Sequence, residues 1–308
     1  MLSRKLTFLL PFVISLLAVP IIQAQENQPV SFQTHEGKLN ISIGGTRFAT
    51  YSFNDAKNTR PYFANVISPA GIQVTRNYPP KKGDQTDHPH HQGIFFTFGD
   101  LNGLDYWHTK GKTIHDKFTH KPTGGNGKGT FTVINRYLSK DEKGTVLTEV
   151  CHYTIRVDKY GHWIEYDTKL TANEDVRIGT KEEGGVAARV ATPLAVINGG
   201  VMTDNENRKG GKAIWGKDAK WVDYSGKLNG NYVGLTIMTH PENPRPSWWH
   251  ARDYGLFAAN PFGPLNSKKG GVNLKRGESM RLRYAVLIHS HDAENLSEVR
   301  EAFRSYVK

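Results

Sequence analysis

Short apolar runs separated by turn formers dominate this chain. The run Met280–His289 begins with alternating apolar and basic residues and then becomes continuously apolar, as expected for a strand that passes from a half-exposed face into a core. Similar runs are Lys38–Ile43, Arg47–Phe53, Ile94–Phe98, Thr130–Tyr137, Thr145–Val157, His162–Leu170, Val233–Thr239 and Tyr254–Ala258. Most of the 31 glycines and 15 prolines lie between these runs, where turns need them. The pattern predicts strands joined by loops.

One segment has the periodicity of a helix. Within Asp292–Val307 the apolar positions recur with a period of 3.6, at Leu296, Val299, Phe303 and Tyr306. Asp292 is the expected N-cap, and Glu294 falls in the first turn. Strands and helices do not alternate along the chain, which excludes a doubly wound sheet. The predicted fold class is therefore all-β, a large antiparallel β-sandwich of the supersandwich kind, closed at one end by the C-terminal helix.

The first residues follow the pattern of a secretory signal peptide. Arg4 and Lys5 precede an apolar run, and the small residue Ala24 precedes Gln25. We therefore expect a signal peptide at residues 1–24, one β-sandwich catalytic domain at residues 25–308, and export to the periplasm. No later stretch reaches the roughly 20 apolar residues that a membrane-spanning helix needs.

The charge of the chain limits its partners, and its cysteine content limits its disulfide and metal sites. The 40 Lys and Arg residues exceed the 29 Asp and Glu residues, which gives a net charge of +11. Such an excess favours anionic partners, and export together with the lack of nucleic-acid-binding motifs excludes nucleic acid. The chain has one cysteine, Cys151, which excludes an internal disulfide or a zinc cluster. We expect Cys151 to be buried and inert.

The segment Asp87-His-Pro-His-His91 is the densest candidate for chemistry. Three histidines in four positions, His88, His90 and His91, interrupted by Pro89, indicate a loop or a sheet edge. Imidazoles titrate near neutral pH and suit proton transfer or substrate contact. Two other interpretations stay open, a metal site and a structural loop in which Asp87 orients His88. We expect no metal and no other cofactor.

Further candidates surround two tryptophan clusters. Trp107 and Trp249 are candidates for stacking on a sugar, although one residue of the pair Trp248-Trp249 should lie in the core because neighbours on a strand point to opposite faces. His250 and Tyr254 are candidate acids. Arg76 and Arg252 are candidate carboxylate clamps, and the other predicted substrate contacts are Arg60, His108, Glu183 and Arg189.

This inventory favours elimination over hydrolysis. It is rich in His, Tyr, Arg and Trp and has no obvious pair of carboxylates, whereas glycoside hydrolysis needs two carboxylates at set distances. Elimination beside a uronate needs a cation for the carboxylate, a base for the α-proton and an acid for the leaving oxygen.

The order of several motifs resembles the PmoA-like domain family. These motifs are Arg60-Pro-Tyr62-Phe63, Val74-Thr75-Arg76, Asp87-His-Pro-His-His91-Gln-Gly93, Gly99-Asp-Leu-Asn-Gly103, Asp105-Tyr-Trp107, Trp215-Gly216, Trp221-Val-Asp223-Tyr224, Trp249 with Arg252, Tyr254-Gly255 and Asn260-Pro261. The resemblance covers roughly residues 45–290, and Gln92 stands where the family usually has Arg. It implies an exported protein of polysaccharide-degrading bacteria, and some relatives resemble dehydratases that act on ulvan oligosaccharides.

The predicted function is therefore that of a carbohydrate-active lyase. Its substrate would be an acidic, ulvan-like oligosaccharide, and the reaction would eliminate water from a terminal uronate. Two alternatives are a mutarotase or epimerase that uses the same histidines with Glu183, and a glycan-binding module without catalysis.

Overall fold

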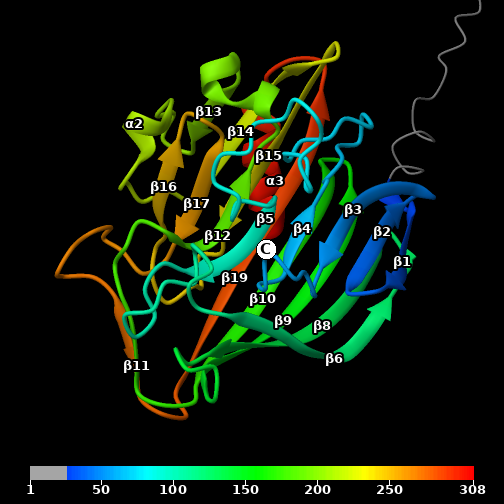
Figure 1. The fold of residues 1–308 in the computed structure, drawn as a ribbon. Helices are drawn as coiled ribbons and strands as arrows, with labels where there is room; N and C mark the ends of the chain where they lie inside the picture. Colours follow the sequence, from blue (N-terminus) through cyan, green and yellow to red (C-terminus); the bar gives the residue numbers. More distant parts are fainter. Residues whose placement is uncertain (1–25) are drawn as a thin grey trace, which may run out of the picture.

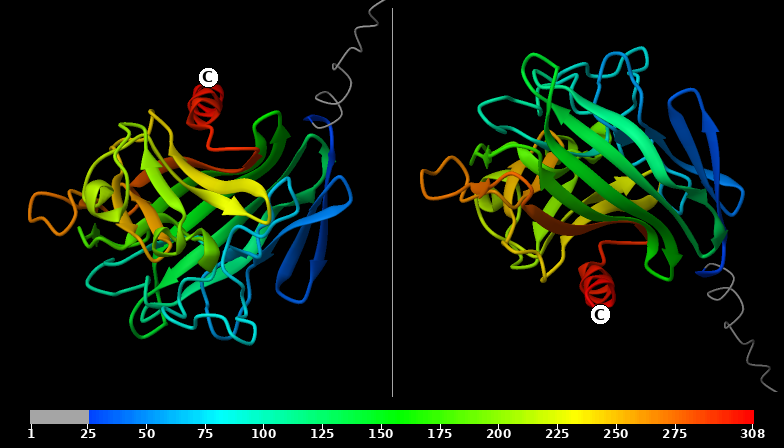
Figure 2. Two further views of the ribbon diagram at one scale, coloured as in Figure 1. Left: turned by 90° about the horizontal axis from the view of Figure 1, so that it is seen from above. Right: turned by 90° about the horizontal axis from the view of Figure 1, so that it is seen from below.

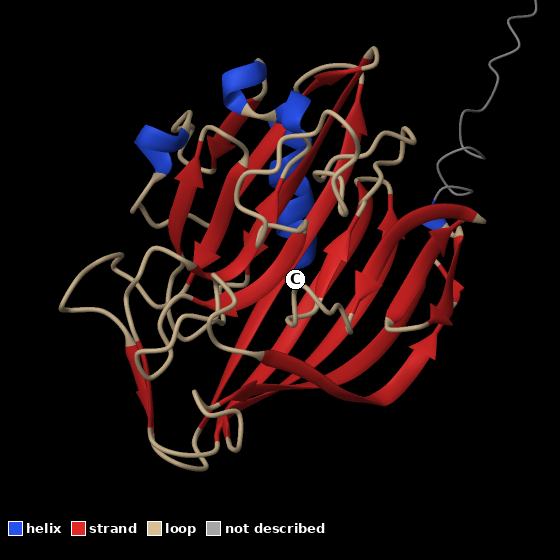
Figure 3. Ribbon diagram, in the orientation of Figure 1, coloured by secondary structure: helices blue, strands red, loops and turns tan. Residues whose placement is uncertain are grey.

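The computed structural model describes residues 26–308 and shows two large antiparallel sheets packed face to face (Figures 1 and 3). The predicted signal peptide lies outside the described residues. One sheet has nine strands, in the order β16 (Trp248–Arg252), β17 (Leu256–Asn260), β12 (Gly184–Arg189), β5 (Ile94–Phe98), β4 (Tyr62–Ala64), β3 (Thr46–Ser52), β2 (Lys38–Ile43), β1 (Pro29–His35) and β7 (Gly125–Asn126). The predicted β-sandwich is confirmed.

The second sheet has eight strands and consists mainly of long hairpins. Its order is β13 (Val201–Asp204), β14 (Trp221–Leu228), β15 (Asn231–Thr239), β19 (Ser279–His291), β10 (Gly161–Ala172), β9 (Thr145–Asp158), β8 (Lys128–Leu138) and β6 (Thr113–Thr123). A small two-stranded sheet pairs β11 (Val176–Ile178) with β18 (Val272–Leu274). The short helical elements are η1 (Thr192–Leu194), η2 (Val196–Asn198) and α2 (Gly211–Ile214).

Alternation of side chains along the strands builds the core between the two sheets. On β8 every second residue is buried, including Phe131 and Val133, because successive side chains of a strand point to opposite faces. Phe131 packs against Tyr51 and Tyr153 with ring centroids 5.2 and 4.9 Å away. Cys151 on β9 is buried and unpaired, as predicted.

Helix α3 (Leu296–Tyr306) packs on the outer face of the eight-stranded sheet and does not close an end of the sandwich, as Figure 2 shows. Its buried residues Val299 and Ala302 join a cluster that contains Trp163 and Trp221. The prediction that Asp292 caps the helix was wrong: the N-cap is Asn295, whose side chain accepts a hydrogen bond from the Glu298 backbone. Among residues 26–308, no helix is long and apolar enough to cross a membrane.

Candidate functional site

The outer face of the nine-stranded sheet carries the predicted site residues. Phe95 on β5, Ala187 on β12 and Ala258 on β17 lie on this face in one small apolar cluster with Trp107. The neighbouring strand residues Phe96 and Phe98 point into the core instead. Two loops, residues 76–93 and 99–112, cover the cluster and bring the histidines onto it. The small side chains Ala187 and Ala258 leave room for these loops.

Two buried arginines, Arg76 and Arg189, bind residues of the first loop, 76–93. Arg76 donates from Nη1 to the carbonyl oxygen of Asp87 (2.8 Å) and from Nη2 to that of Gln85 (2.6 Å). Arg189 donates from Nη2 to Asp87 Oδ2 (2.9 Å), and its guanidinium lies 4.6 Å from the centre of the Tyr254 ring. Both arginines are buried. The prediction that Arg76 is a carboxylate clamp stays a prediction: its terminal nitrogens bind the protein's own loop, although the side chain lines two pockets.

Arg60 joins the two loops to each other. It donates from Nη1 to the carbonyl oxygen of Trp107 (2.6 Å) and from Nη2 to Gln92 Oε1 (3.1 Å) and the carbonyl oxygen of His90. The guanidinium lies 3.9 Å from the centre of the Phe95 ring. Burial lowers the pKa of Arg60 to about 9. Arg60 is only 2% exposed, so it is a positioning residue and not the substrate contact that we predicted.

Three side chains contact the His88 ring: Asp87, His91 and Tyr254. Its Nδ1 lies 2.7 Å from Asp87 Oδ2, and its ring lies nearly parallel to the rings of His91 and Tyr254, with centroids 5.1 and 4.9 Å away. The backbone of His88 has φ +45°, a region that costs energy for residues other than Gly and is often found at functional sites. Because Asp87 occupies Nδ1, the free nitrogen of this exposed ring is Nε2.

A second exposed imidazole repeats this arrangement in the other loop. His108 Nδ1 lies 2.9 Å from Asp105 Oδ2, and the backbone nitrogen of His108 donates to Asp105 Oδ1 (3.0 Å). The His90 ring lies between the two pairs, 4.4 Å from His108 and 5.9 Å from His88 by ring centroids. Two carboxylate-bound imidazoles therefore flank a third histidine.

The partly buried His90 and the buried His91 are neutral at neutral pH. Burial lowers the pKa of His90 to about 3 and that of His91 well below its usual value. Trp107 donates from its indole nitrogen to His91 Nε2 (3.1 Å). An indole N–H can only donate, so the proton of neutral His91 is on Nδ1. Trp107 is 1% exposed, which corrects our prediction that it stacks on a sugar.

A third group of residues lies where β16 borders the cluster. His250 is 3% exposed, and its Nε2 lies 4.0 Å from Glu182 Oε1. Burial lowers the pKa of His250 to about 4. Glu182 accepts hydrogen bonds from Arg252 (2.8 and 2.9 Å) and from the Trp215 indole (2.7 Å). Arg252 is thus already paired with a carboxylate of this chain.

Trp249 belongs to the core and not to the site. It is fully buried on the inner side of β16, packs near Phe257 and donates from its indole to the carbonyl oxygen of Ala219 (3.1 Å). The prediction that it stacks on substrate was wrong, because the alternation along β16 puts His250 and Arg252 on the outer face. Glu183 does lie near the cluster: burial and the charge of Glu182 raise its pKa.

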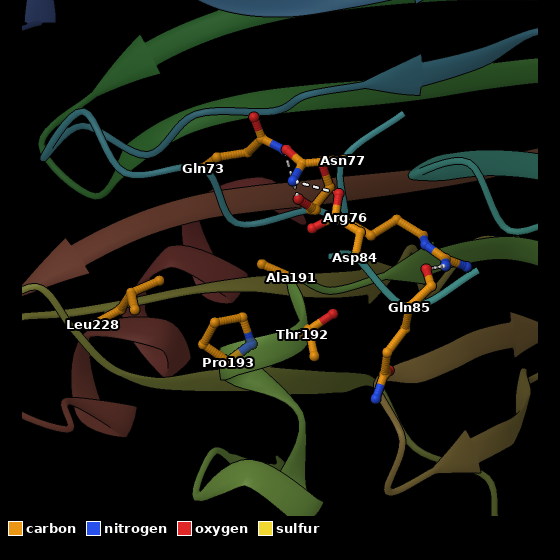
Figure 4. Close-up of a pocket in the computed structure, with 10 residues that line it drawn as sticks. Gln73, Arg76, Asn77, Asp84, Gln85, Ala191, Thr192, Pro193 and Leu228 are labelled. Atoms are coloured by element: carbon orange, nitrogen blue, oxygen red, sulfur yellow. Dashed lines mark hydrogen bonds between the residues drawn. The ribbon is translucent and has the colours of Figure 1, made fainter. Parts of the chain in front are cut away.

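A pocket of about 320 Å³ opens between the loops. Its wall includes Lys57, Arg76, Tyr78, His90, His91 and His108, and no carboxylate from the described part of the chain lines it. Arg76 also lines a second pocket of about 240 Å³, in which Gln73 and Asn77 face Thr192 and Pro193 across the gap (Figure 4). Within residues 26–308, no three His, Cys, Asp or Glu side chains are placed to hold a metal ion.

The structure thus gathers most of the predicted residues and adds several. His88, His90, His91, His108 and Tyr254 lie together, with His250 and Glu183 beside them. Sequence reasoning missed the roles of Asp105, Glu182, Lys57 and Tyr78. The available signals were the spacing of Asp105 three residues before His108 and the neighbouring pair Glu182-Glu183.

No curated protein matches this chain closely enough to count as a relative. Solved structures with a similar arrangement include the GH36 alpha-galactosidase AgaB from Geobacillus stearothermophilus, with 10% identity and a TM-score of 0.41 over 87% of this chain and 42% of that one. A galactose mutarotase-like protein from Clostridium acetobutylicum has 12% identity and a TM-score of 0.36 over 87% and 99%. A polysaccharide lyase has 12% identity and a TM-score of 0.35 over 90% and 34%.

Identities and TM-scores this low say nothing about what this chain binds or catalyses. The chain spans less than half of the galactosidase that it matches. A family model, in contrast, matches residues 38–304, which include both loops of the site and every strand of the two large sheets except β1. The chain belongs to this family, DUF6807, a family of unknown function.

Proposed function

We propose that this chain is a carbohydrate-active enzyme that eliminates water from a terminal uronate of an acidic oligosaccharide. The observation that carries the proposal is the pair of exposed imidazoles, His88 and His108, each bound through Nδ1 to a carboxylate. A carboxylate at Nδ1 fixes the tautomer, so that Nε2 is the nitrogen available to a substrate. His108 lines the pocket, and His88 lies next to it, against the His90 and His91 rings. We assign one of the two imidazoles as the base and the other as the acid.

The reaction assigns one proton to each imidazole. A neutral imidazole takes the proton from the carbon next to the substrate carboxylate, and the electrons of that C–H bond form the new C=C bond. The C–O bond to the neighbouring hydroxyl breaks, and a protonated imidazole gives its proton to the leaving oxygen, which departs as water. The atoms balance without any further reactant.

The charge of the pocket supports an anionic substrate. Lys57 and Arg76 line it, together with three histidines, whereas no Asp or Glu of residues 26–308 does. Positive groups in a partly enclosed site attract anions and stabilise the negative charge that builds up on a carboxylate during proton abstraction. The pocket volume of about 320 Å³ is at the lower end of small-molecule sites, which suits a single terminal sugar.

The test uses uronate-terminated oligosaccharides and mass spectrometry with ultraviolet absorbance. Elimination of water lowers the product mass by one water, creates a conjugated chromophore and keeps the chain length. General acid–base groups contribute about 100- to 10,000-fold in rate, so His88→Gln and His108→Gln should each lose activity by that factor. The matched control is His120→Gln, because His120 is exposed on β6, away from the pocket. A product of unchanged chain length without a chromophore would refute the proposal.

One observation favours a second candidate, a mutarotase or epimerase. Glu183 lies beside the cluster with a raised pKa, caused by burial and by Glu182, and carboxylates with raised pKa values are common proton-transfer groups. This reaction leaves the substrate mass unchanged and gives no chromophore. It also depends on Glu183, so Glu183→Gln would abolish it while leaving elimination by the two imidazoles largely intact.

A further inference from the structure

We propose that Lys57 binds the carboxylate of the ligand in the histidine-lined pocket and thereby selects an acidic sugar over its neutral counterpart. The inference rests on the proposed function, because it names the group that recognises the uronate. It concerns a residue outside the two histidine-bearing loops, on the segment between β3 and β4.

The other cations of the region are already bound to the protein. Arg60 and Arg76 donate to backbone carbonyls of the two loops, and Arg189 binds Asp87. Arg252 binds Glu182 and does not line the pocket. Arg60 and Arg189 do not line the pocket either, and Arg76 already uses both of its terminal nitrogens on loop carbonyls. Lys57 and Arg76 are the permanently charged residues of the pocket wall, which leaves Lys57.

The backbone at Lys57 is anchored, while its side chain is free. The backbone nitrogen of Lys57 donates to Asp55 Oδ1 (2.8 Å), and Asp55 Oδ2 accepts a hydrogen bond from Tyr62 (2.6 Å), a buried residue of β4. The next residue, Asn58, is buried and donates to the Tyr78 hydroxyl. Within residues 26–308, the ammonium group of Lys57 has neither a hydrogen bond nor an ion pair.

Among residues 26–308, no carboxylate lines the pocket and competes for this ammonium group. Asp55, the nearest acidic residue along the chain, lines a different pocket together with Lys112 and His115. A ligand carboxylate would therefore meet an unpaired cation on a fixed backbone. Since His108 lines the same pocket, a sugar held at Lys57 lies in the space that the Asp105-bound imidazole also borders.

The experiment measures the preference for an acidic sugar directly. The probes are a disaccharide with a terminal glucuronate and its carboxyl-reduced counterpart with a terminal glucose, each titrated into the full chain by calorimetry at low salt. Lys57→Met should lower the affinity for the acidic probe about 10- to 100-fold, because the variant loses a hydrogen bond between charged groups. The variant should bind the neutral probe as the wild type does. Lys57→Arg keeps the charge and should retain most of the preference.

Lys82→Met is the matched control, because Lys82 is an exposed lysine within the loop 76–93 that does not line the pocket. A wild type without preference for the acidic probe, or a Lys57→Met variant that keeps the wild-type preference, would overturn the inference. Failure of the proposed function looks different: the wild type would bind the acidic probe through Lys57 and yet produce no chromophore. That result would support Lys57 as a carboxylate contact and reject dehydration.

Discussion

Two His–Asp pairs on opposite sides of the sandwich have nearly the same geometry and different surroundings. His88 and Asp87 lie 2.7 Å apart with side chains that are 42% and 37% exposed, whereas His289 and Asp223 lie 2.8 Å apart with 2% exposure each. The first pair lies in a loop above the nine-stranded sheet. The second lies on the face of the eight-stranded sheet that also carries Trp221 and Leu287.

The difference shows that access, and not the pair itself, decides what such a pair can do. Burial opposes the charge of Asp223, yet His289, Ser225 and Thr236 together keep its pKa below the ordinary value. A buried, fully hydrogen-bonded pair of this kind stabilises the packing of its strands. The Asp87 carboxylate is held by Arg189 from below, and the exposed His88 ring presents its Nε2 outward. Four predictions test this contrast, and they follow in order of decreasing expected effect.

The largest effect is expected from breaking the buried pair. Asp223 accepts hydrogen bonds from Ser225 and Thr236 and lies 2.8 Å from His289 Nε2. Its removal leaves these buried groups without their partner, which together costs about 3–5 kcal/mol. Asp223→Ala should therefore lower the free energy of unfolding by that amount in a denaturant titration. His88→Ala, which breaks the exposed pair but leaves Asp87 bound to Arg189, should cost less than about 1 kcal/mol. Equal losses from the two variants would contradict the contrast.

The exposed pair of His88 and Asp87 should affect the reaction rate rather than the stability of the fold. Asp87→Asn keeps the size of the side chain but no longer fixes the charge and tautomer of His88, so turnover should fall by about 100-fold or more. The measurement is the rate of chromophore formation with a uronate-terminated oligosaccharide. Asp223→Asn is the control, and its surviving folded fraction should turn over at the wild-type rate.

Acidification should destabilise the protein through its buried histidines. Burial lowers the pKa of His250 to about 4, whereas an unfolded histidine titrates near about 6.5. Below that value the unfolded state binds more protons, so the contribution of His250 is present above about pH 6.5 and is lost as the pH falls toward 4. Between pH 7 and pH 5 this amounts to about 2 kcal/mol.

His250→Asn should therefore lose less stability than the wild type when unfolding is compared at these two pH values. His162, whose pKa burial also lowers to about 4, lies in the sandwich and provides the comparison. His162→Asn should show the same reduced pH dependence of stability. Identical pH dependence in the wild type and both variants would show that burial does not hold these rings neutral.

The smallest effect concerns helix α3, which packs on the outer face of the eight-stranded sheet. Asn295→Ala removes the side chain that accepts a hydrogen bond from the Glu298 backbone at the start of α3, and loss of an N-cap costs about 1 kcal/mol. Asp292→Ala, at the position that the sequence pattern indicated, should change stability by less than about 0.5 kcal/mol. The reverse order in thermal unfolding would restore Asp292 as the cap.

The strands that could be read from the sequence are those with a regular apolar pattern. Runs such as Ile94–Phe98 and Lys38–Ile43 match β5 and β2 at both ends. In contrast, β12 has the sequence Gly-Gly-Val-Ala-Ala-Arg, whose small residues have little strand propensity on their own. It becomes a strand because β5 and β17 pair with it on both sides. Pairing between segments that are distant in the sequence has no local signature.

The same limit explains which site residues were misassigned. The sequence places His88, His90 and His91 within four positions, so their proximity was predictable. It does not show that the donors of Arg60 and Arg76 point at backbone carbonyls, because those contacts arise only when two loops fold over one sheet. Trp249 was assigned to the wrong face because the register of a five-residue strand decides which of two neighbouring tryptophans is buried.

The bonds of Arg60 have a consequence for motion. One guanidinium donates to Trp107 in one loop and to His90 and Gln92 in the other. We therefore expect the fluctuations of the two loops on the picosecond to nanosecond timescale to be correlated, with NMR order parameters of their amides that are high and similar. Loops joined in this way should keep the His88 and His108 rings at a nearly constant spacing.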